Sequence, residues 1–176
     1  MTVRPIVSFP DPRLSATAHR VESFDAGLSQ LADDLLDTLH AAPGIGITAP
    51  HVGIQLRLVV IDLADGAGAR VYVNPSIEWA SQDRARHPEG SVSMPGLTET
   101  LERPARVRVT YQDLSGAARA EEASGLRSVC LQHEIDQLDG VFWIERLSRL
   151  KRERLLKRFE KARTLARGPH PKPAAP

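Results

Sequence analysis

The segment from Gln132 to Gly140 places an imidazole, a carboxylate and an amide on a predicted helix. His133 and Gln137 are four residues apart, so they share one helical face, and Glu134 follows His133 directly. In the pattern H-E-x-x-H, two imidazoles one turn apart hold a metal ion while the glutamate moves protons for its bound water. Here Gln137 stands in place of the second histidine. An amide oxygen is a weak neutral ligand for zinc or iron, so the motif alone supports a metal site only weakly.

Apolar periodicity predicts the elements that position this segment. Leucines at helical spacing predict a helix that begins near Asp25, capped by Asp25 or Ser29, and that stops at the Pro43-Gly44 loop. Ser124 is predicted to cap the central helix and Gly140 to close it. A last helix spans 148–167, and the prolines of segment 6–14 predict an extended chain. β-branched runs predict strands at 56–63, 70–75, 77–81, 106–111 and 117–123, with a proline ending the second. Strands around one central helix, with a helix near each end, indicate the α+β class.

Length and composition indicate one ordinary globular unit. The 176 residues suffice for a single domain, which we expect over 1–167, and the four prolines of 168–176 predict a disordered tail. Hydrophobic residues make up 41% and charged residues 26%. No apolar run approaches the roughly 20 residues that span a membrane, and no signal peptide is seen, so we expect a cytoplasmic monomer. Cys130 is the only cysteine, which agrees with a reducing compartment. No phosphate-binding or dinucleotide fingerprint appears, which argues against nucleotide binding.

Three segments together resemble one family. Residues 44–53 read G-I-G-I-T-A-P-H-V-G, residues 89–93 read E-G-S-V-S, and residues 132–140 read Q-H-E-I-D-Q-L-D-G. In order and spacing they resemble the three motifs of the peptide deformylases, over about residues 3–165. The resemblance implies a peptide deformylase-like fold, with antiparallel or mixed sheets around the helix that carries His133. It also implies the family's activity, in which a bacterial enzyme of protein biosynthesis uses Fe²⁺, Ni²⁺ or Zn²⁺ to hydrolyse the formyl group from N-terminal formyl-methionine.

The resemblance also shows what this chain lacks. The family holds its metal with one cysteine and two histidines, and of these positions only His133 is kept, because Ser91 and Gln137 replace the other two. A serine hydroxyl is not ionised near neutral pH and an amide offers only a dipole. We therefore expect no metal or weak metal binding, and weak or absent deformylation.

Other catalytic positions are partly retained. Glu134 matches the family's proton shuttle, while His51 replaces the glutamine that hydrogen-bonds the developing oxyanion. Val92, the residue after Ser91, is counted with the catalytic positions.

The cleft that would hold a peptide resembles the family's more closely than the metal site does. Gly46 and Gly90 lie where a substrate backbone adds alongside the sheet. The resemblance is weaker at two positions: His87 stands where the family usually has a hydrophobic pocket residue, and Arg127, directly after Leu126, stands where another apolar side chain is common. Glu89 and Arg103 match an ion pair that braces the second motif. The apolar positions that match the family's methionine pocket are Ile45, Leu126, Val129 and Cys130.

Two alternatives remain open. The first is an active hydrolase with a rewired site, in which Glu134, His133 and His51 act together, with His87 as a further metal ligand or Ser91 as a nucleophile. The second is a ribosome-associated binding protein that acts through the basic C-terminal helix. That helix carries Arg149, Lys151, Arg152, Arg154, Lys157, Arg158, Lys161, Arg163 and Arg167 against Glu153 and Glu160. Either way, the expected partners are formyl-methionyl or other short peptide N-termini, with no membrane.

Overall fold

The computed structural model describes residues 2–167, so the predicted tail at 168–176 lies outside the described residues. Three α-helices are found in this part of the chain: α1 (Ala26–Ala41), α2 (Gly125–Leu138) and α3 (Arg149–Arg167). Asp25 caps α1, because its carboxylate accepts a hydrogen bond from the backbone N–H of Leu28 at 3.0 Å. Ser124 precedes α2 without a side-chain cap bond, and Gly140 follows it with a φ of 79°. The three predicted helices are confirmed.

A five-stranded antiparallel sheet supports α2, in the order β1-β2-β3-β6-β7. Val107 and Val109 of β6 point into the core between exposed charged neighbours, as a strand with one wet face should. The predicted hairpin at 106–123 is confirmed, as is the α+β class. The strands are β1 (Gly46–Thr48), β2 (Leu58–Ile61), β3 (Arg70–Ala80), β6 (Arg106–Gln112) and β7 (Ala118–Ser124).

β3 is longer than the sequence indicates. The prediction that Pro75 ends one strand and that 77–81 forms another is wrong, because β3 runs without a break from Arg70 to Ala80. The register against β6 shifts between Val73 and Ser76, and Asn74 has a φ of 53°. Such a bulge leaves residues out of the ladder, so the missing N–H of Pro75 costs no hydrogen bond.

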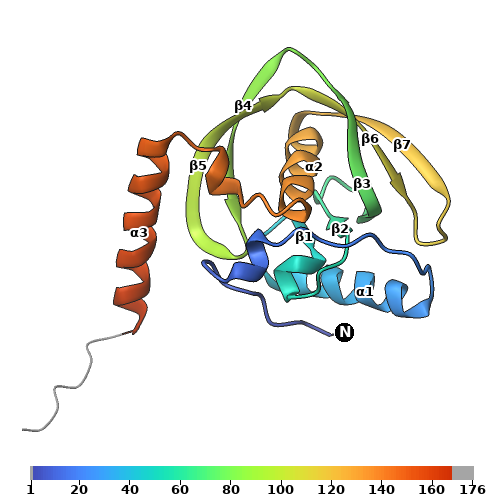
Figure 1. Cartoon of the computed structure of the whole chain (residues 1–176), viewed down its shortest axis with the longest axis horizontal. Helices are drawn as coiled ribbons and strands as arrows, with labels where there is room; N and C mark the ends of the chain where they lie inside the picture. The colour runs from blue at the N-terminus through green and yellow to red at the C-terminus, as the bar shows by residue number, and fades with distance from the viewer. Residues whose placement is uncertain (1, 168–176) are drawn as a thin grey trace, which may run out of the picture.

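The residue patterns did not predict the hairpin that forms the second sheet. β4 (Arg84–Ser91) and β5 (Met94–Pro104) form a two-stranded antiparallel hairpin, with His87 opposite Leu101 and Ser91 opposite Met94. Its charged residues and prolines hide any simple alternation of apolar side chains. In Figure 1, α2 lies between this hairpin and the larger sheet, and α1 lies beneath β1 and β2.

The N-terminal segment is extended only in part. Residues 12–15 form a short 3-10 helix, η1 (Pro12–Ser15), which corrects the prediction of an extended chain there. Proline is tolerated in a first turn because its missing N–H needs no partner at that position. Asp11 caps this turn by accepting the N–H of Arg13 at 3.0 Å.

α3 stands at the edge of the molecule, beside β5 (Figure 1). It is attached through Leu155 and Phe159, which join the cluster around Phe142 and Trp143. Within residues 2–167, no helix is long and apolar enough to cross a membrane.

Candidate functional site

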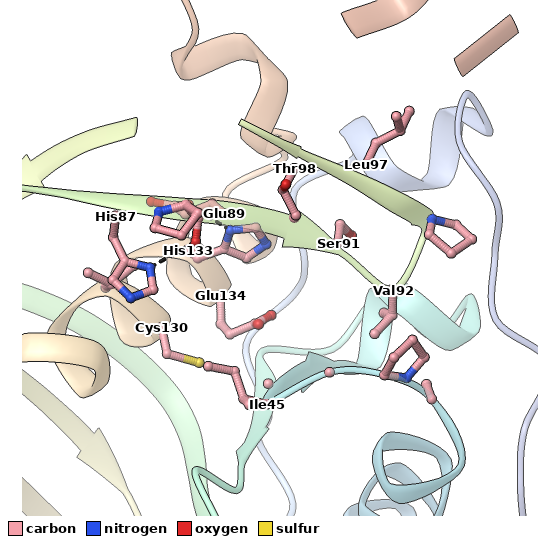
Figure 2. A pocket seen from close by; sticks show the side chains of 18 of the residues that line it. Ile45, His87, Glu89, Ser91, Val92, Leu97, Thr98, Cys130, His133 and Glu134 are labelled. Atoms are coloured by element: carbon pink, nitrogen blue, oxygen red, sulfur yellow. Dashed lines mark hydrogen bonds and ion pairs between the residues drawn. The ribbon is translucent and has the colours of Figure 1, made fainter. Parts of the chain in front are cut away.

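A cavity of about 440 Å³ lies between α2, the loop that leads into β1, and the β4–β5 hairpin (Figure 2). It brings together twelve residues singled out from the sequence for catalysis, substrate binding or metal ligation. Gln137, the thirteenth, is not among the lining residues. The twelve are Ile45, Gly46, His51, His87, Gly90, Ser91, Val92, Leu126, Val129, Cys130, His133 and Glu134.

His133 is fixed by its contact with β4. Its Nδ1 lies 2.9 Å from Oε2 of Glu89, and because a carboxylate accepts, Nδ1 carries the proton of that bond. Burial lowers the pKa of His133, but the hydrogen bond to Glu89 and the charges of Glu134 and Glu89 outweigh it, so the pKa is raised overall. Figure 2 shows the opposite edge of the ring turned toward Ser91.

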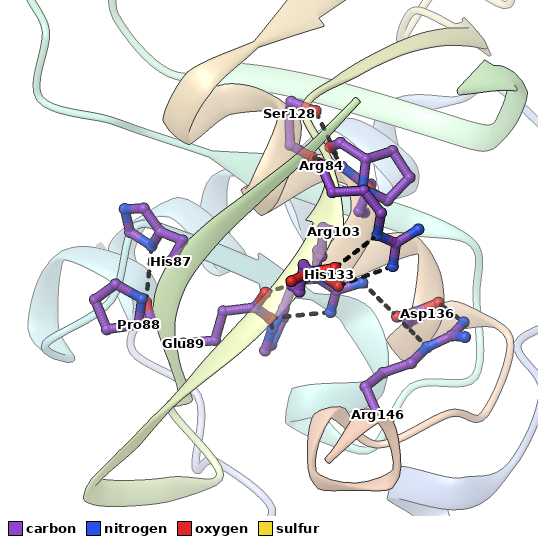
Figure 3. A network of polar contacts seen from close by, with 12 residues as sticks. Arg84, His87, Pro88, Glu89, Arg103, Ser128, His133, Asp136 and Arg146 are labelled. Carbon is purple, nitrogen blue, oxygen red and sulfur yellow. Dashed lines mark hydrogen bonds and ion pairs between the residues drawn. The ribbon is translucent and has the colours of Figure 1, made fainter. Parts of the chain in front are cut away.

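A buried ion-pair network holds Glu89 in place (Figure 3). Arg103 on β5 donates to both Glu89 oxygens at 2.6 and 2.9 Å, and to Asp136 on α2 at 2.8 Å. Arg146 donates to Asp136 at 3.0 Å. Burial raises the pKa of Glu89, but the bonds from His133 and Arg103 outweigh it and lower the pKa overall. The predicted Glu89–Arg103 pair is therefore confirmed, and it braces the second motif against α2.

Glu134 is buried without a hydrogen bond among the described residues. Its Oε2 has no partner, and this oxygen lies 3.9 Å from Nδ1 of His51. The carboxylate packs so tightly against β1 that a Cβ at Gly46 would lie 2.5 Å from its Oε1. Burial raises the pKa of Glu134 to about 7, with a smaller lowering by His133 and a raising by Glu89. This carboxyl is suited to exchange a proton near neutral pH.

His51 is held in one tautomer. The backbone N–H of Thr48 donates to its Nδ1 at 3.0 Å, so Nδ1 must be unprotonated and the ring proton sits on Nε2. That Nε2 is buried and has no partner among the described residues. Burial, and next the charge on His133, lower the pKa of His51 to about 3, so the ring stays neutral.

Ser91 and Val92 form the turn end of β4. The Oγ of Ser91 accepts the backbone N–H of Ser93 at 3.1 Å and has no hydrogen bond to a histidine of the described chain, so nothing marks it as an activated nucleophile. A Cβ at Gly44 would lie 2.7 Å from Cγ1 of Val92, which shows how closely the loop before β1 meets this turn.

Gln137 turns away from the cavity. Its Nε2 donates to the backbone carbonyl of Leu14 in η1 at 2.7 Å, and its side chain is buried there. Gln137 and His133 both lie on α2, four residues apart as expected. The Gln137 amide nevertheless bonds to the N-terminal segment and does not face the cavity.

The donors at this site do not fit the family's metal. His133 supplies one imidazole nitrogen, Ser91 a neutral hydroxyl, and Gln137 is already engaged with Leu14. Throughout residues 2–167, no three side chains among histidine, cysteine, aspartate and glutamate lie where they could share a metal ion. That arrangement also gives no support to a metal held by His51, His133 and His87.

The apolar end of the cavity is open at its rim. Ile45 and Leu126 are 37% and 38% exposed, whereas Val129 and Cys130 are buried beneath them. Burial raises the pKa of Cys130 well above its usual range, which leaves a neutral thiol that packs as an apolar group. His87 lines the wall, and its Nδ1 donates to the carbonyl of Pro88 at 2.8 Å.

Several lining residues were missed. Thr48, which lies behind the lining, was also missed: it fixes His51 by hydrogen bonds, and its place inside the first motif was the signal that could have found it. The opposite wall comes from β5, where Leu97 and Thr98 line the cavity. No signal pointed to them, because β5 itself was not predicted.

Comparisons with known proteins agree on one family. A family model described as polypeptide deformylase matches residues 3–153. A Brucella melitensis protein named "Peptide deformylase-like" is 63% identical over 161 residues, covering 92% of this chain and 98% of that one. A "Peptide deformylase" of Afipia carboxidovorans is 46% identical over 169 residues, covering 94% and 99%. The crystal structure of a peptide deformylase from Legionella pneumophila superposes with a TM-score of 0.88 at 38% identity, covering 96% of this chain and all of that chain.

Proposed function

The chain belongs to the polypeptide deformylase family, and from that premise we propose that it binds peptide N-termini in the cavity while metal-dependent deformylation is weak or absent. The family is one of metal-dependent deformylases, so two parts of the proposal need support. One is the loss of the metal, and the other is the retention of the cleft.

The observation that carries the first part is the contact between Gln137 and Leu14. A ligand must face the metal, but the Gln137 amide donates at 2.7 Å to a backbone carbonyl outside the cavity. Turning it back would leave the Leu14 carbonyl without this donor, which is costly for a buried group. With Ser91 neutral, His133 is the only kept ligand, and one imidazole does not hold Zn²⁺ or Fe²⁺ firmly.

The cleft supports the second part. Apolar side chains line one end of the 440 Å³ cavity, and polar groups converge at the other, which is the usual composition of a ligand site. β1 is an edge strand, so its outer side is available to an added peptide strand. Cavity and edge meet at Gly46, where an extended peptide would place its first residue.

Two measurements on the purified protein test the loss of metal chemistry. Elemental analysis should find far less than one metal ion per chain, and formyl-Met-Ala-Ser should release little or no formate. Near one metal per chain with ordinary turnover would end the proposal. Adding Ser91→Cys together with Gln137→His then asks whether these two positions alone account for the loss, in which case metal and formate release should recover.

A second candidate is an active hydrolase with a rewired site. The approach of His51 to Glu134, 3.9 Å between Nδ1 and Oε2, favours it, as does the raised pKa of Glu134. Here Glu134 is the general acid and base, with His133 and His51 binding the substrate oxygen. His51→Ala should then abolish formate release, and release that survives this substitution excludes the candidate.

The remaining parts of the proposal concern the surroundings of the protein. We propose a cytoplasmic monomer whose basic α3 contacts the ribosome, because most charged side chains of α3 between Arg149 and Arg163 are exposed while Leu155 and Phe159 hold the helix to the body. Ribosome co-sedimentation that is unchanged after Lys157 and Arg158 are both replaced by glutamate would remove α3 from this role.

A further inference from the structure

A second cleft lies between α3, the N-terminal segment and the turn that joins β4 to β5. Its volume is about 490 Å³, and of its lining residues only Pro95 also lines the cavity described above. Figure 1 shows α3 standing beside the hairpin. We call this space the α3 cleft, and its lining includes Phe9, Pro10, Ser93, Pro95, Phe159 and Arg163.

Aromatic and proline rings form the apolar wall of the α3 cleft. The ring of Phe9 lies 5.7 Å from that of Phe159, edge to face, and stacks on the ring of Phe142 at 5.0 Å. Pro10 and Pro95 are exposed beside them. Aromatic-lined grooves are the surfaces on which proline-rich segments usually dock.

The polar groups of the α3 cleft include two donors without a partner in the described chain. Ser93 is 1% exposed, and its Oγ has no hydrogen-bond partner among residues 2–167. The guanidinium of Arg163 lies over the ring of Phe159, 5.5 Å from its centre, and no carboxylate of the same residues pairs with it. Leaving a buried hydroxyl without a partner is costly, so a ligand that accepts from Ser93 is favoured.

A proline-rich backbone is a ligand that needs such donors. Proline has a carbonyl but no N–H, and the polyproline II helix makes no internal hydrogen bonds, so its carbonyls accept from outside. The carboxylate of Asp11 at the α3 cleft is already paired with Arg13 at 2.8 Å. The Ser93 hydroxyl and the Arg163 guanidinium therefore remain as donors, and both suit a backbone that carries mainly acceptors.

A segment of this composition follows α3 in the sequence. Residues 168–176 read G-P-H-P-K-P-A-A-P. Residues 173–176 have the spacing P-x-x-P, which places two prolines on one side of a helix with three residues per turn. Proline-rich segments are ordered at a low entropic cost because their chain is largely preformed.

The distance from the end of α3 also fits. α3 ends at Arg167, which lies roughly 12 Å beyond Phe159 at a rise of about 1.5 Å per residue. A chain in the polyproline II conformation covers that distance in about four residues at about 3.1 Å each. Gly168 followed by Pro169 suits a reversal, since helices commonly end at a glycine with a proline shortly after it.

We propose that residues 168–176 dock in the α3 cleft of the same chain. Their proline rings pack against Phe9 and Phe159, and their carbonyls accept hydrogen bonds from Ser93 and Arg163. Docking joins the end of α3 to the N-terminal segment. It does not depend on the proposed function, because it involves a different surface from the cavity beside α2.

Backbone NMR relaxation of the ¹⁵N-labelled full chain tests the inference. The N–H groups of His170, Lys172 and Ala174 report on the segment directly. Docking should give these three groups order parameters that approach about 0.85, the value of rigid backbone, and stay above about 0.6. Values below about 0.6 in the wild type overturn the inference.

A variant of the α3 cleft locates the binding surface. Ser93→Ala combined with Arg163→Gln removes both donors, so the three order parameters should fall below about 0.6. The matched control is Lys161→Gln, which changes an exposed charge on the same helix outside the α3 cleft and should leave them unchanged. Unfolding curves establish that both variants are folded. Order that persists without the two donors shows that the segment is held elsewhere and overturns the inference.

Two further measurements identify the occupant. Replacing Pro171, Pro173 and Pro176 together by serine keeps the length and charge of the segment and should also lower the order parameters below about 0.6. Order that survives this change overturns the role of the prolines. A dilution series separates one chain from two, because docking within a chain does not depend on concentration. Order that is lost on dilution assigns the α3 cleft to the segment of a second copy and overturns docking within one chain.

Discussion

Glu134 shows how much a single residue depends on its surroundings. A glutamate at the surface titrates near its ordinary value of 4.5, but burial against β1 without a hydrogen-bond donor raises the pKa of Glu134 to about 7. The same packing requires glycine at position 46, because a Cβ there would lie 2.7 Å from Sγ of Cys130 as well as 2.5 Å from the carboxylate. The position therefore favours a protonated carboxyl in the ligand-free protein at acidic pH.

This raised pKa predicts a pH-dependent stability. The folded state binds the Glu134 proton more tightly than the unfolded state, so the stabilisation is fully present below about pH 4.5 and is lost as pH rises through about 7. The free energy of unfolding should fall by up to about 3 kcal/mol across this window. Urea unfolding of wild type and of Glu134→Gln, measured in parallel from pH 5 to 8, isolates this contribution as their difference.

An exposed carboxylate provides the control. Glu22→Gln should leave the pH profile of the wild type unchanged, because Glu22 is exposed on the surface. If the free energy of unfolding depended on pH in the same way in the wild type and in Glu134→Gln, Glu134 would not be held in this buried state.

At the level of elements, the Gln137–Leu14 contact joins α2 to η1. The residue that replaces a family metal ligand instead joins the central helix to the N-terminal segment, and we call this contact the clamp.

Gln137→Ala removes the donor to a buried carbonyl, so it should lower the free energy of unfolding by about 2 kcal/mol. Urea unfolding measures this, and the exposed control Gln82→Ala should change it by less than about 0.5 kcal/mol. Equal effects of the two substitutions would mean that the clamp contributes nothing.

Elements with local signals were predictable from the sequence. The leucines of α1 recur at helical spacing, and Val107 and Val109 of β6 alternate with charged residues. These local patterns predict a helix and a strand, and the structure confirms both elements. The β4–β5 hairpin was missed because its buried positions include Glu89 and Arg103, which pair with each other and do not follow an apolar pattern.

The candidate site was predictable to the same extent. Local motifs identify His133 and Glu134, and both line the cavity because they belong to the one helix that faces it. The orientation of Gln137 was not predictable, because it depends on where the distant residue Leu14 lies in space, and no local spacing encodes that.

At the level of the whole molecule, the network around Arg103 links elements that are far apart in sequence. Glu89 lies on β4, Arg103 on β5, Asp136 on α2 and Arg146 in η3 (Trp143–Arg146), so one cluster ties the small hairpin to the central helix and to the segment before α3 (Figure 3). This cluster also holds Nδ1 of His133 through Glu89.

Breaking the network should destabilise the molecule as a whole. Arg103→Met leaves Glu89 and part of Asp136 without a buried counter-charge, which should cost about 3 to 5 kcal/mol. Thermal and urea unfolding measure the loss. Arg84→Met, on the same hairpin, removes only an exposed pair with Glu102 and should cost less than about 1 kcal/mol. A mild effect of Arg103→Met would show that the hairpin is held by apolar packing alone.

The larger sheet has two outer borders that differ in character. β7 carries Arg119, Glu121 and Glu122, and such charges discourage a neighbouring molecule from stacking its own strand there. β1 ends the sheet at the other border with only Gly46, Ile47 and Thr48, and no charge guards it. Strand-to-strand association is therefore opposed at the β7 edge. The uncharged β1 edge adjoins the cavity of about 440 Å³, which is too small to admit a second folded copy.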